Sequence, residues 1–261
     1  MVDRRYASLL LLVAALLLLG GCKPAKTRLT IRGGPSLDAL FSDLVKRYQE
    51  QHPEVTVITD FTCPPCVLFK RPGMKANFDL FASLGQFELD HLSRTGQISF
   101  SQTSEIGYTN LALVTSSRVK APVRSIADLH KPGLRRIGVG DPAQVGVGYY
   151  AKQALAKAGL WQELQPRFVY TQSGCDLLKW LSLGRDIDAA IVWSLCLGEE
   201  PGSIKSVVVF PREMSPPVPL LLGIPAAAAN APEAQRFIEF ARSAAARDLM
   251  EKHRIQPVTS P

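Results

Sequence analysis

The sequence contains few of the residues from which most active sites are built. It has four histidines in 261 residues, and they lie far apart, at His52, His91, His130 and His253. This dispersion fits neither a metal-binding motif nor a catalytic one, and no nucleophile–histidine signature or convincing pair of catalytic carboxylates is present. We therefore expect a protein that is not an enzyme and that carries no cofactor.

The sequence also lacks a tract of charge of one sign. Lysines and arginines number 30 against 23 acidic residues, which gives a formal net charge of +7, but the basic residues are scattered. A nucleic-acid-binding protein usually shows a basic face or an aromatic–basic motif. We therefore expect no nucleic-acid partner, although the excess of positive charge favours anionic ligands or lipid headgroups.

The N-terminal segment combines charge, hydrophobicity and a cysteine. Arg4 and Arg5 precede an apolar run over residues 9–19, and two glycines then stand directly before Cys22. The run is shorter than the roughly 20 residues that a membrane-spanning helix needs. The segment resembles a lipoprotein signal, in which the cysteine is acylated and begins the mature chain. We therefore expect residues 1–21 to be a signal peptide and residues 22–28 a lipidated tether. The folded part would then lie outside the cytoplasmic membrane, in the periplasm or at the cell surface.

Four further cysteines follow at Cys63, Cys66, Cys175 and Cys196. An even number in an exported protein is compatible with two disulfides. It is equally compatible with four thiolates around one soft metal ion. The spacing alone leaves both possibilities open.

Helical and strand patterns alternate along the chain. Apolar residues between Leu37 and Tyr48 recur at helical spacing, and residues 55–61 alternate as a strand does. This alternation favours an α/β fold with largely parallel sheets. Further strands are expected at 29–31, 79–84, 110–115, 136–139, 168–170, 189–193, 207–210 and 220–224, and helices at 149–158, at 176–183 and from Pro232 onward.

The most specific stretch spans residues 137–161 and reads IGVGDPAQVGVGYYAKQALAKAGLW. A strand followed by G-D-P, a glycine-containing turn and a Y-A-K-x-A-L helix ending in G-L-W is typical of one family. Supporting matches lie at 34–37 (GPSL), 78–83 (FDLFAS), 188–193 (DAAIVW), 207–211 (VVVFP) and 232–254. The chain thus resembles the molybdate-binding family of solute-binding proteins, the receptors of ABC importers, over nearly all of its mature length.

The resemblance implies an α/β, two-lobed periplasmic-binding-protein fold of type II, with mixed sheets flanked by helices and a hinge between the lobes. Lobe 1 would hold residues 29–110 and 213–261, and lobe 2 residues 111–212. A solute would bind in the cleft between the lobes, and closure would signal the membrane subunits of the importer. We expect the receptor to act as a monomer.

The resemblance also implies how the solute is held. Helix N-termini and hydroxyl groups suit a molybdate or tungstate dianion without a lysine. Ser36 matches the serine of the first helix that contacts the oxyanion. Val147 matches a residue that donates its backbone N–H, and Gly174 matches another such donor. Trp193 stands where the family commonly has a tyrosine whose hydroxyl donates to the ligand.

The loop after the second strand departs from the family pattern. The family has a small, serine-rich loop that supplies a second hydroxyl, whereas residues 62–66 read TCPPC and place Cys63 there. Cys175 follows Gly174, and Cys196 lies three residues after Trp193. The alignment would therefore place all four thiols in the cleft, two from each lobe.

These cysteines allow several interpretations. Cys63 with Cys66, and Cys175 with Cys196, could form disulfides within each lobe. The four could instead ligate Cu(I), Zn(II) or a thiophilic metalloid when the lobes close. They could also be tolerated as small hydrophobic residues. A thiol–disulfide oxidoreductase using Cys63 and Cys66 is a further alternative, although no aromatic residue precedes Cys63.

Overall fold

The computed structural model describes residues 26–61, 77–172, 174–183, 187–197 and 204–258. The predicted signal peptide, with Cys22, and the loop that carries Cys63 and Cys66 lie outside these residues. None of the described helices is both long enough and apolar enough to cross a bilayer.

The strands form two separate sheets. The first has six strands in the order β11-β4-β10-β3-β1-β2, and the second has five in the order β7-β6-β8-β5-β9. Strands of the first sheet are β1 Thr27–Gly33, β2 Val55–Asp60, β3 Leu80–Leu84, β4 Phe100–Thr109, β10 Val218–Pro225 and β11 Gln256–Pro257. Strands of the second sheet are β5 Leu111–Ser116, β6 Ile137–Gly140, β7 Phe168–Thr171, β8 Ala189–Trp193 and β9 Ile204–Val209.

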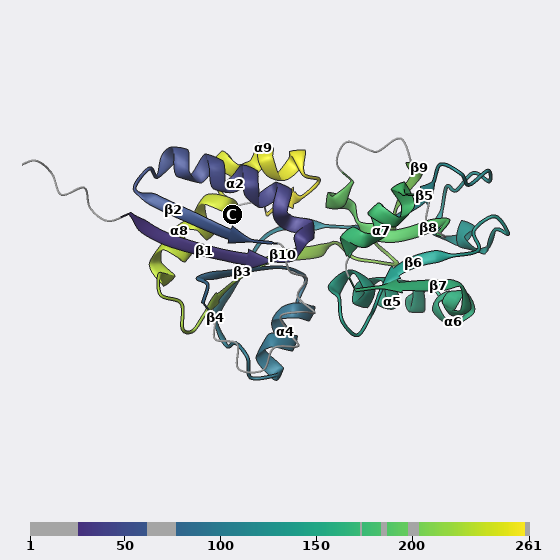
Figure 1. Cartoon of the computed structure of the whole chain (residues 1–261), viewed down its shortest axis with the longest axis horizontal. Coiled ribbons are helices and arrows are strands. Elements are labelled where there is room, and N and C mark those ends of the chain that lie inside the picture. Colours follow the sequence, from purple (N-terminus) through teal and green to yellow (C-terminus); the bar gives the residue numbers. More distant parts are fainter. Residues whose placement is uncertain (1–25, 62–76, 173, 184–186, 198–203, 259–261) are drawn as a thin grey trace, which may run out of the picture.

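Helices cover both sheets (Figure 1). On the first sheet they are α2 Asp38–Gln51, α4 Phe87–Arg94, α8 Ala231–Arg242 and α9 Ala244–Lys252. On the second they are α5 Gly146–Lys157, α6 Trp161–Leu164 and α7 Gly174–Ser182. Short 3-10 helices are η1 Pro35–Leu37, η2 Ile126–His130, η3 Gln165–Arg167 and η4 Ser194–Cys196.

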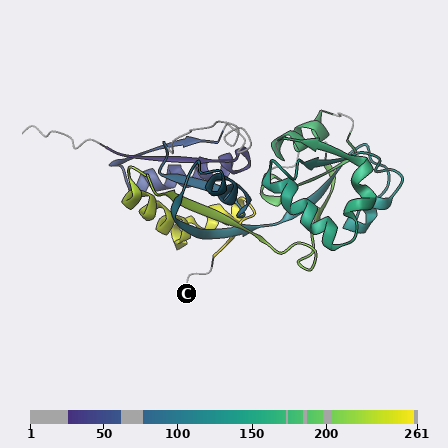
Figure 2. The same ribbon diagram turned by 90° about the horizontal axis from the view of Figure 1, so that it is seen from below.

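The two sheets and their helices form two bodies joined by two crossing segments (Figure 2). We call the body with the six-stranded sheet lobe 1 and the body with the five-stranded sheet lobe 2. The chain leaves lobe 1 where β4 leads through Asn110 into β5, and it returns through residues 210–217 into β10. At the first crossing, the N–H of Ser194 donates to the carbonyl of Asn110 at 2.8 Å. The two-lobed fold is confirmed, whereas the predicted lobe boundaries stay a prediction.

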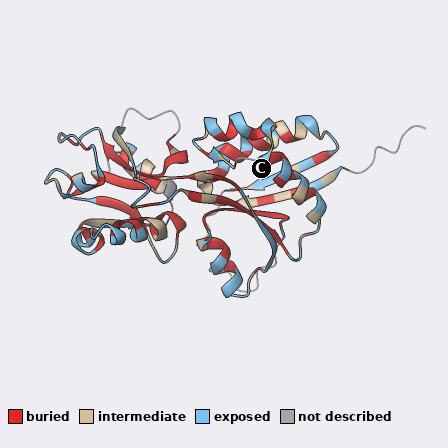
Figure 3. Cartoon of the chain, turned by 180° about the vertical axis from the view of Figure 1, so that it is seen from behind, coloured by how far each residue is buried: buried red, intermediate tan, exposed pale blue. Residues whose placement is uncertain are grey.

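Burial in lobe 2 explains why its central strands read as continuous apolar runs. Every residue of β5 and of β8 is buried (Figure 3). Along β5, Leu111 and Leu113 join the core that includes α5, whereas Ala112 and Val114 pack in a second core with α7. Helices therefore cover this sheet on both faces, as in other α/β proteins.

The expectation of largely parallel sheets is wrong. Among the described strands, β1 runs parallel to β2 and β3, and β6 runs parallel to β7 and β8. The remaining five pairings are antiparallel. The reason is the double crossing: β4 leaves lobe 1 and β10 re-enters it, so these neighbours run in opposite directions, with Val218 opposite Thr109.

Candidate functional site

The candidate residues lie where strands end. β1 leads into η1, β6 into α5, β7 into α7, and β8 into η4. Ser36 lies in η1, Val147 in the first turn of α5, Gly174 at the start of α7, and Trp193 at the end of β8. Ligands of open α/β sheets bind outside the carboxyl ends of the strands. Each of these four residues therefore lies at or after the carboxyl end of a strand, a position suited to ligand binding.

Contacts across the lobes bring the elements of these residues together. The η1 turn of lobe 1, which carries Ser36, contacts α7 of lobe 2, which begins at Gly174. The α4 helix of lobe 1 contacts α5, which carries Val147. Ser36 is half-buried, and Val147 and Trp193 are buried. Both lobes thus contribute elements to one interface, and contact of these residues with a ligand stays a prediction.

The turn before α5 presents the start of that helix. Asp141 organises the turn, because its carbonyl accepts the N–H groups of Gln144 and Val145 at 3.0 and 2.9 Å. A Cβ on Gly148 would lie 2.1 Å from the carbonyl oxygen of Gly140, so the bare glycine lets α5 approach β6 closely. Within the helix, the N–H groups of Val147 and Gly148 have no acceptor, because they belong to its first turn.

A buried carboxylate from the other lobe meets this helix start. Oε1 of Glu88, on α4, accepts the N–H of Gly146 at 3.0 Å, and Oε2 lies 2.8 Å from the Ser83 hydroxyl oxygen. The Glu88 residue is 7 % exposed. Burial raises the pKa of Glu88 to about 7, although its bonds to Ser83 and Gly146 lower it. A carboxyl group that titrates near neutrality therefore lies directly beside the N-terminus of α5.

Glu88 was not among the residues predicted from the sequence. A signal was present, because Glu88 stands next to Leu89 and four residues before Leu92, on the side of the helix that packs inward. Acidic residues are almost never fully buried without a partner. Its partner, Gly146, is 58 residues away in the sequence, so no local pattern could have revealed the contact.

Aromatic side chains extend the same interface. The Tyr150 ring lies 5.8 Å from the Trp193 ring, between centroids, and the Tyr149 ring lies 4.8 Å from the Phe87 ring of lobe 1. The Tyr150 hydroxyl accepts the backbone N–H of Gln86 at 2.9 Å. Burial raises the pKa of Tyr150, which keeps it a neutral phenol. Trp193 is thus connected to lobe 1 through Tyr150.

Most of the predicted soft-metal site lies outside the described residues. Cys63 and Cys66 lie beyond the described residues, and the side chain of Cys175 is not described. Cys196 ends η4 and packs, partly buried, against the main core. No cluster of three or more potential metal ligands occurs within the described ranges.

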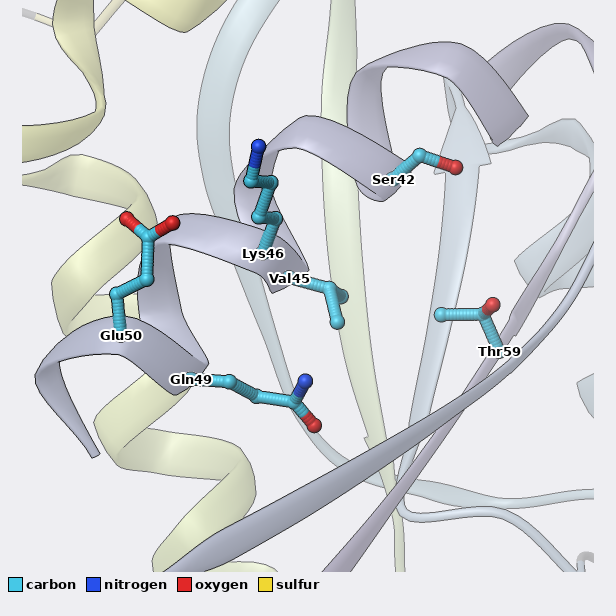
Figure 4. Close-up of a pocket in the computed structure, with 6 residues that line it drawn as sticks. All are labelled: Ser42, Val45, Lys46, Gln49, Glu50 and Thr59. Carbon is cyan, nitrogen blue, oxygen red and sulfur yellow. The ribbon is translucent and has the colours of Figure 1, made fainter. Parts of the chain in front are cut away.

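Two hollows are lined by residues other than the predicted site residues. One, of about 490 Å³, lies between α2 and β2 (Figure 4). Its lining side chains are Ser42, Val45, Lys46, Gln49, Glu50 and Thr59. The other, of about 680 Å³, lies beside α5 and is lined by aromatic residues that include Phe87, Tyr149 and Tyr170. Neither hollow contains Ser36, Val147, Gly174 or Trp193.

The protein has two lobes joined by two crossing segments, and elements at strand ends of both lobes meet at one interface. This arrangement defines the class of two-lobed periplasmic solute-binding proteins. Comparison with known proteins gives the family. The model of a family described as bacterial extracellular solute-binding protein matches residues 29–253, and the chain belongs to this family.

The relatives agree with this assignment. YvgL of Bacillus subtilis (strain 168) is named as an ABC transporter substrate-binding lipoprotein. It is 24% identical to this chain, and the match covers 96% of this chain and 97% of YvgL. The molybdate-binding protein ModA of Haemophilus influenzae is 27% identical to this chain, and the match covers 89% of this chain and 91% of ModA. The solved structure of the periplasmic molybdate-binding protein of Azotobacter vinelandii superposes on this chain with a TM-score of 0.71 and 17% sequence identity. The superposition covers 89% of this chain and 99% of the other. The predicted resemblance to the molybdate-binding family is confirmed, and the protein is an extracytoplasmic, ABC-transporter-type solute-binding protein.

Proposed function

We propose that this protein is a lipid-anchored receptor of an ABC importer that captures a molybdate- or tungstate-type oxyanion between its lobes. The observation that carries the proposal is the contact between the lobes of η1 with α7 and of α4 with α5, the latter at the start of α5. Positive helix N-termini and unpaired N–H groups bind anions. The molybdate-binding names of two relatives add support.

In this proposal the oxyanion contacts the Ser36 hydroxyl, the backbone N–H groups of Val147 and Gly174, and Trp193. Cys63 occupies the position of the second hydroxyl. A ligand that touches both lobes stabilises the closed arrangement, because only there does it make all of its contacts. The closed monomer then docks on the membrane subunits of the importer.

The remaining parts of the proposal concern the chain as a whole. Cys22 carries the lipid that anchors the protein to a membrane, in line with the lipoprotein name of YvgL. Lobe 1 comprises residues 29–110 and 213–261, and lobe 2 comprises residues 111–212. The division of the strands between the two sheets supports these boundaries.

Titration calorimetry with sodium molybdate and sodium tungstate tests the function. We expect saturable binding of one oxyanion per chain, together with an increase in melting temperature. Val147→Pro removes one N–H donor and should weaken binding by about tenfold or more. Val147→Ala, the matched control, keeps that N–H. No binding of either oxyanion, with stabilisation by Cu(I) or Zn(II) under reducing conditions, would instead favour ligation by the cysteines.

A further inference from the structure

A three-member hydrogen-bond chain lies beside the start of α5. The Ser83 hydroxyl oxygen is 2.7 Å from the carbonyl oxygen of Gly85 and 2.8 Å from Oε2 of Glu88. A hydroxyl has one hydrogen to donate. If Ser83 donates to Gly85, the Glu88 carboxyl must supply the hydrogen between Oε2 and Ser83. A protonated Glu88 therefore fits this geometry, because its hydrogen goes to Ser83 and the Ser83 hydrogen goes to the Gly85 carbonyl.

The ionised form has a different arrangement. Ser83 then turns its hydrogen to Glu88, and the Gly85 carbonyl loses that donor. No ion pair between Glu88 and a basic side chain occurs among the residues the structure describes. The negative charge is therefore stabilised by the Gly146 N–H, the Ser83 hydroxyl, the backbone N–H of Glu88 itself and the positive end of α5.

Charged and titratable groups lie on both helices around Glu88. On α4 itself they are Asp90, His91 and Arg94, and α5 carries the neutral phenol of Tyr150 together with Tyr149, Lys152 and Lys157. β3, against which α4 packs, has no ionisable side chain. A second negative charge that arrives at the start of α5 would thus meet the buried Glu88 carboxyl, which already accepts the Gly146 N–H there. The Asp141 carboxylate lies in the turn that precedes the helix.

The proposed oxyanion site uses that same helix start. Gly146, whose N–H Glu88 accepts, directly precedes Val147. A Cβ on Gly146 would lie 2.5 Å from Oε1 of Glu88, so the carboxyl group fills the space beside this residue. An ionised Glu88 and a dianion would therefore compete for the positive end of one helix, and repulsion between them weakens both.

We propose that Glu88 takes up one proton from solvent when a dianion binds at the start of α5. This inference rests on the proposed function. The proton goes to Oε2, Ser83 turns its hydrogen to Gly85, and Oε1 keeps the Gly146 N–H. The bound state therefore contains one negative group, the ligand, at this helix end.

Calorimetric titration of the full mature chain with sodium molybdate, in buffers of different ionisation enthalpy, measures this proton. At about pH 8, where Glu88 is mainly ionised in the free protein, we expect uptake of nearly one proton on binding. Glu88→Gln should bind without proton uptake. Asp90→Asn, the matched control on the exposed side of α4, should take up as much as the parent protein.

The affinity should follow the same linkage. Above about pH 7, molybdate binding to the parent protein should weaken by up to roughly tenfold per pH unit, whereas Glu88→Gln should show no such change. Ser83→Ala keeps the carboxyl group but removes its hydroxyl donor. The pH at which affinity begins to fall should then move upward, an effect that a purely structural role would not produce.

The outcomes separate the inference from the function. Molybdate binding with equal proton uptake by the parent protein and Glu88→Gln, or with none in either, overturns the role of Glu88 and leaves the oxyanion receptor intact. Absence of molybdate binding by the parent protein and by every variant at every pH overturns both. Proton uptake that is lost only in Glu88→Gln supports both.

Discussion

The phenolic oxygen of Tyr150 accepts the backbone N–H of Gln86 at 2.9 Å, which ties α5 of lobe 2 to the segment before α4 of lobe 1. The neighbouring Gly85 has a φ of +81°, and a Cβ there would lie 2.1 Å from the same phenolic oxygen. The bare backbone at Gly85 thus leaves room for the Tyr150 side chain to make this contact between the lobes.

Tyr150→Phe tests this contact. Loss of the phenolic acceptor should lower the free energy of unfolding by about 1 kcal/mol, because water can reach Gln86 and replace part of the bond. Tyr149→Phe removes a neighbouring hydroxyl and should stay within about 0.5 kcal/mol of the parent protein. Urea unfolding curves of the three proteins provide the comparison, and equal losses in both variants would contradict the specific role of Tyr150.

The approach of α5 to β6 gives a second prediction. Gly148→Ala places a methyl group against the Gly140 carbonyl and should displace the start of the helix. We expect a loss of about 1–3 kcal/mol in unfolding free energy and weaker molybdate binding. In Gly133→Ala, the nearest atom to the new Cβ would be 3.7 Å away, so this variant should change neither the unfolding free energy nor molybdate binding appreciably. A Gly148→Ala protein with normal stability would show that the helix start has room to move.

The apolar segments explain what could be predicted from the sequence. The strand expected at residues 189–193 coincides with β8, because every residue there is buried and a continuous apolar run identifies it. The helix expected at residues 149–158 overlaps α5, although α5 begins earlier, at Gly146. Local pattern thus located the elements whose packing dominates their sequence.

Elements that are partly buried and partly exposed were not predicted correctly from the sequence. No strand was predicted for β4, because four of its ten residues are exposed and its polar sequence, FSQTSEIGYT, gives no sign of its pairing with β10 and β11. The single closing helix expected from Pro232 is two helices, since Ser243 ends α8 and its hydroxyl caps α9 by accepting the Ala245 N–H. The partnership of Glu88 with Gly146 depends on how the lobes meet, which no local pattern encodes.

The four cysteines give a third prediction. If the oxyanion is held by helix N–H groups and the Ser36 hydroxyl, replacing Cys63, Cys66, Cys175 and Cys196 by serine should leave molybdate affinity within about threefold. Thiolates carry negative charge and contribute no attraction to a dianion. A thiol count on protein purified without reductant should accompany the titration. Loss of molybdate binding in the variant with four serines would show that the thiols hold the solute.

The titration of Glu88 gives a fourth prediction, for stability in the absence of ligand. Burial raises the pKa of Glu88 from an ordinary 4.5 to about 7, so between these values the folded state binds more protons than the unfolded state. Stability must then decrease as the pH rises through this window, by about 3 kcal/mol in total. Below about pH 4.5 both states are protonated and the contribution is fully present.

Burial lowers the pKa of His91, which acts in the opposite direction near pH 6.5, so the contribution of Glu88 must be isolated as a difference. Urea unfolding at several values between about pH 4.5 and about pH 7.5 should show the parent protein losing stability relative to Glu88→Gln. Asp90→Asn should follow the parent protein. Parallel curves for the parent protein and Glu88→Gln would mean that solvent reaches the carboxyl group. The hydrogen-bond chain through Ser83 would then not hold a proton near neutral pH.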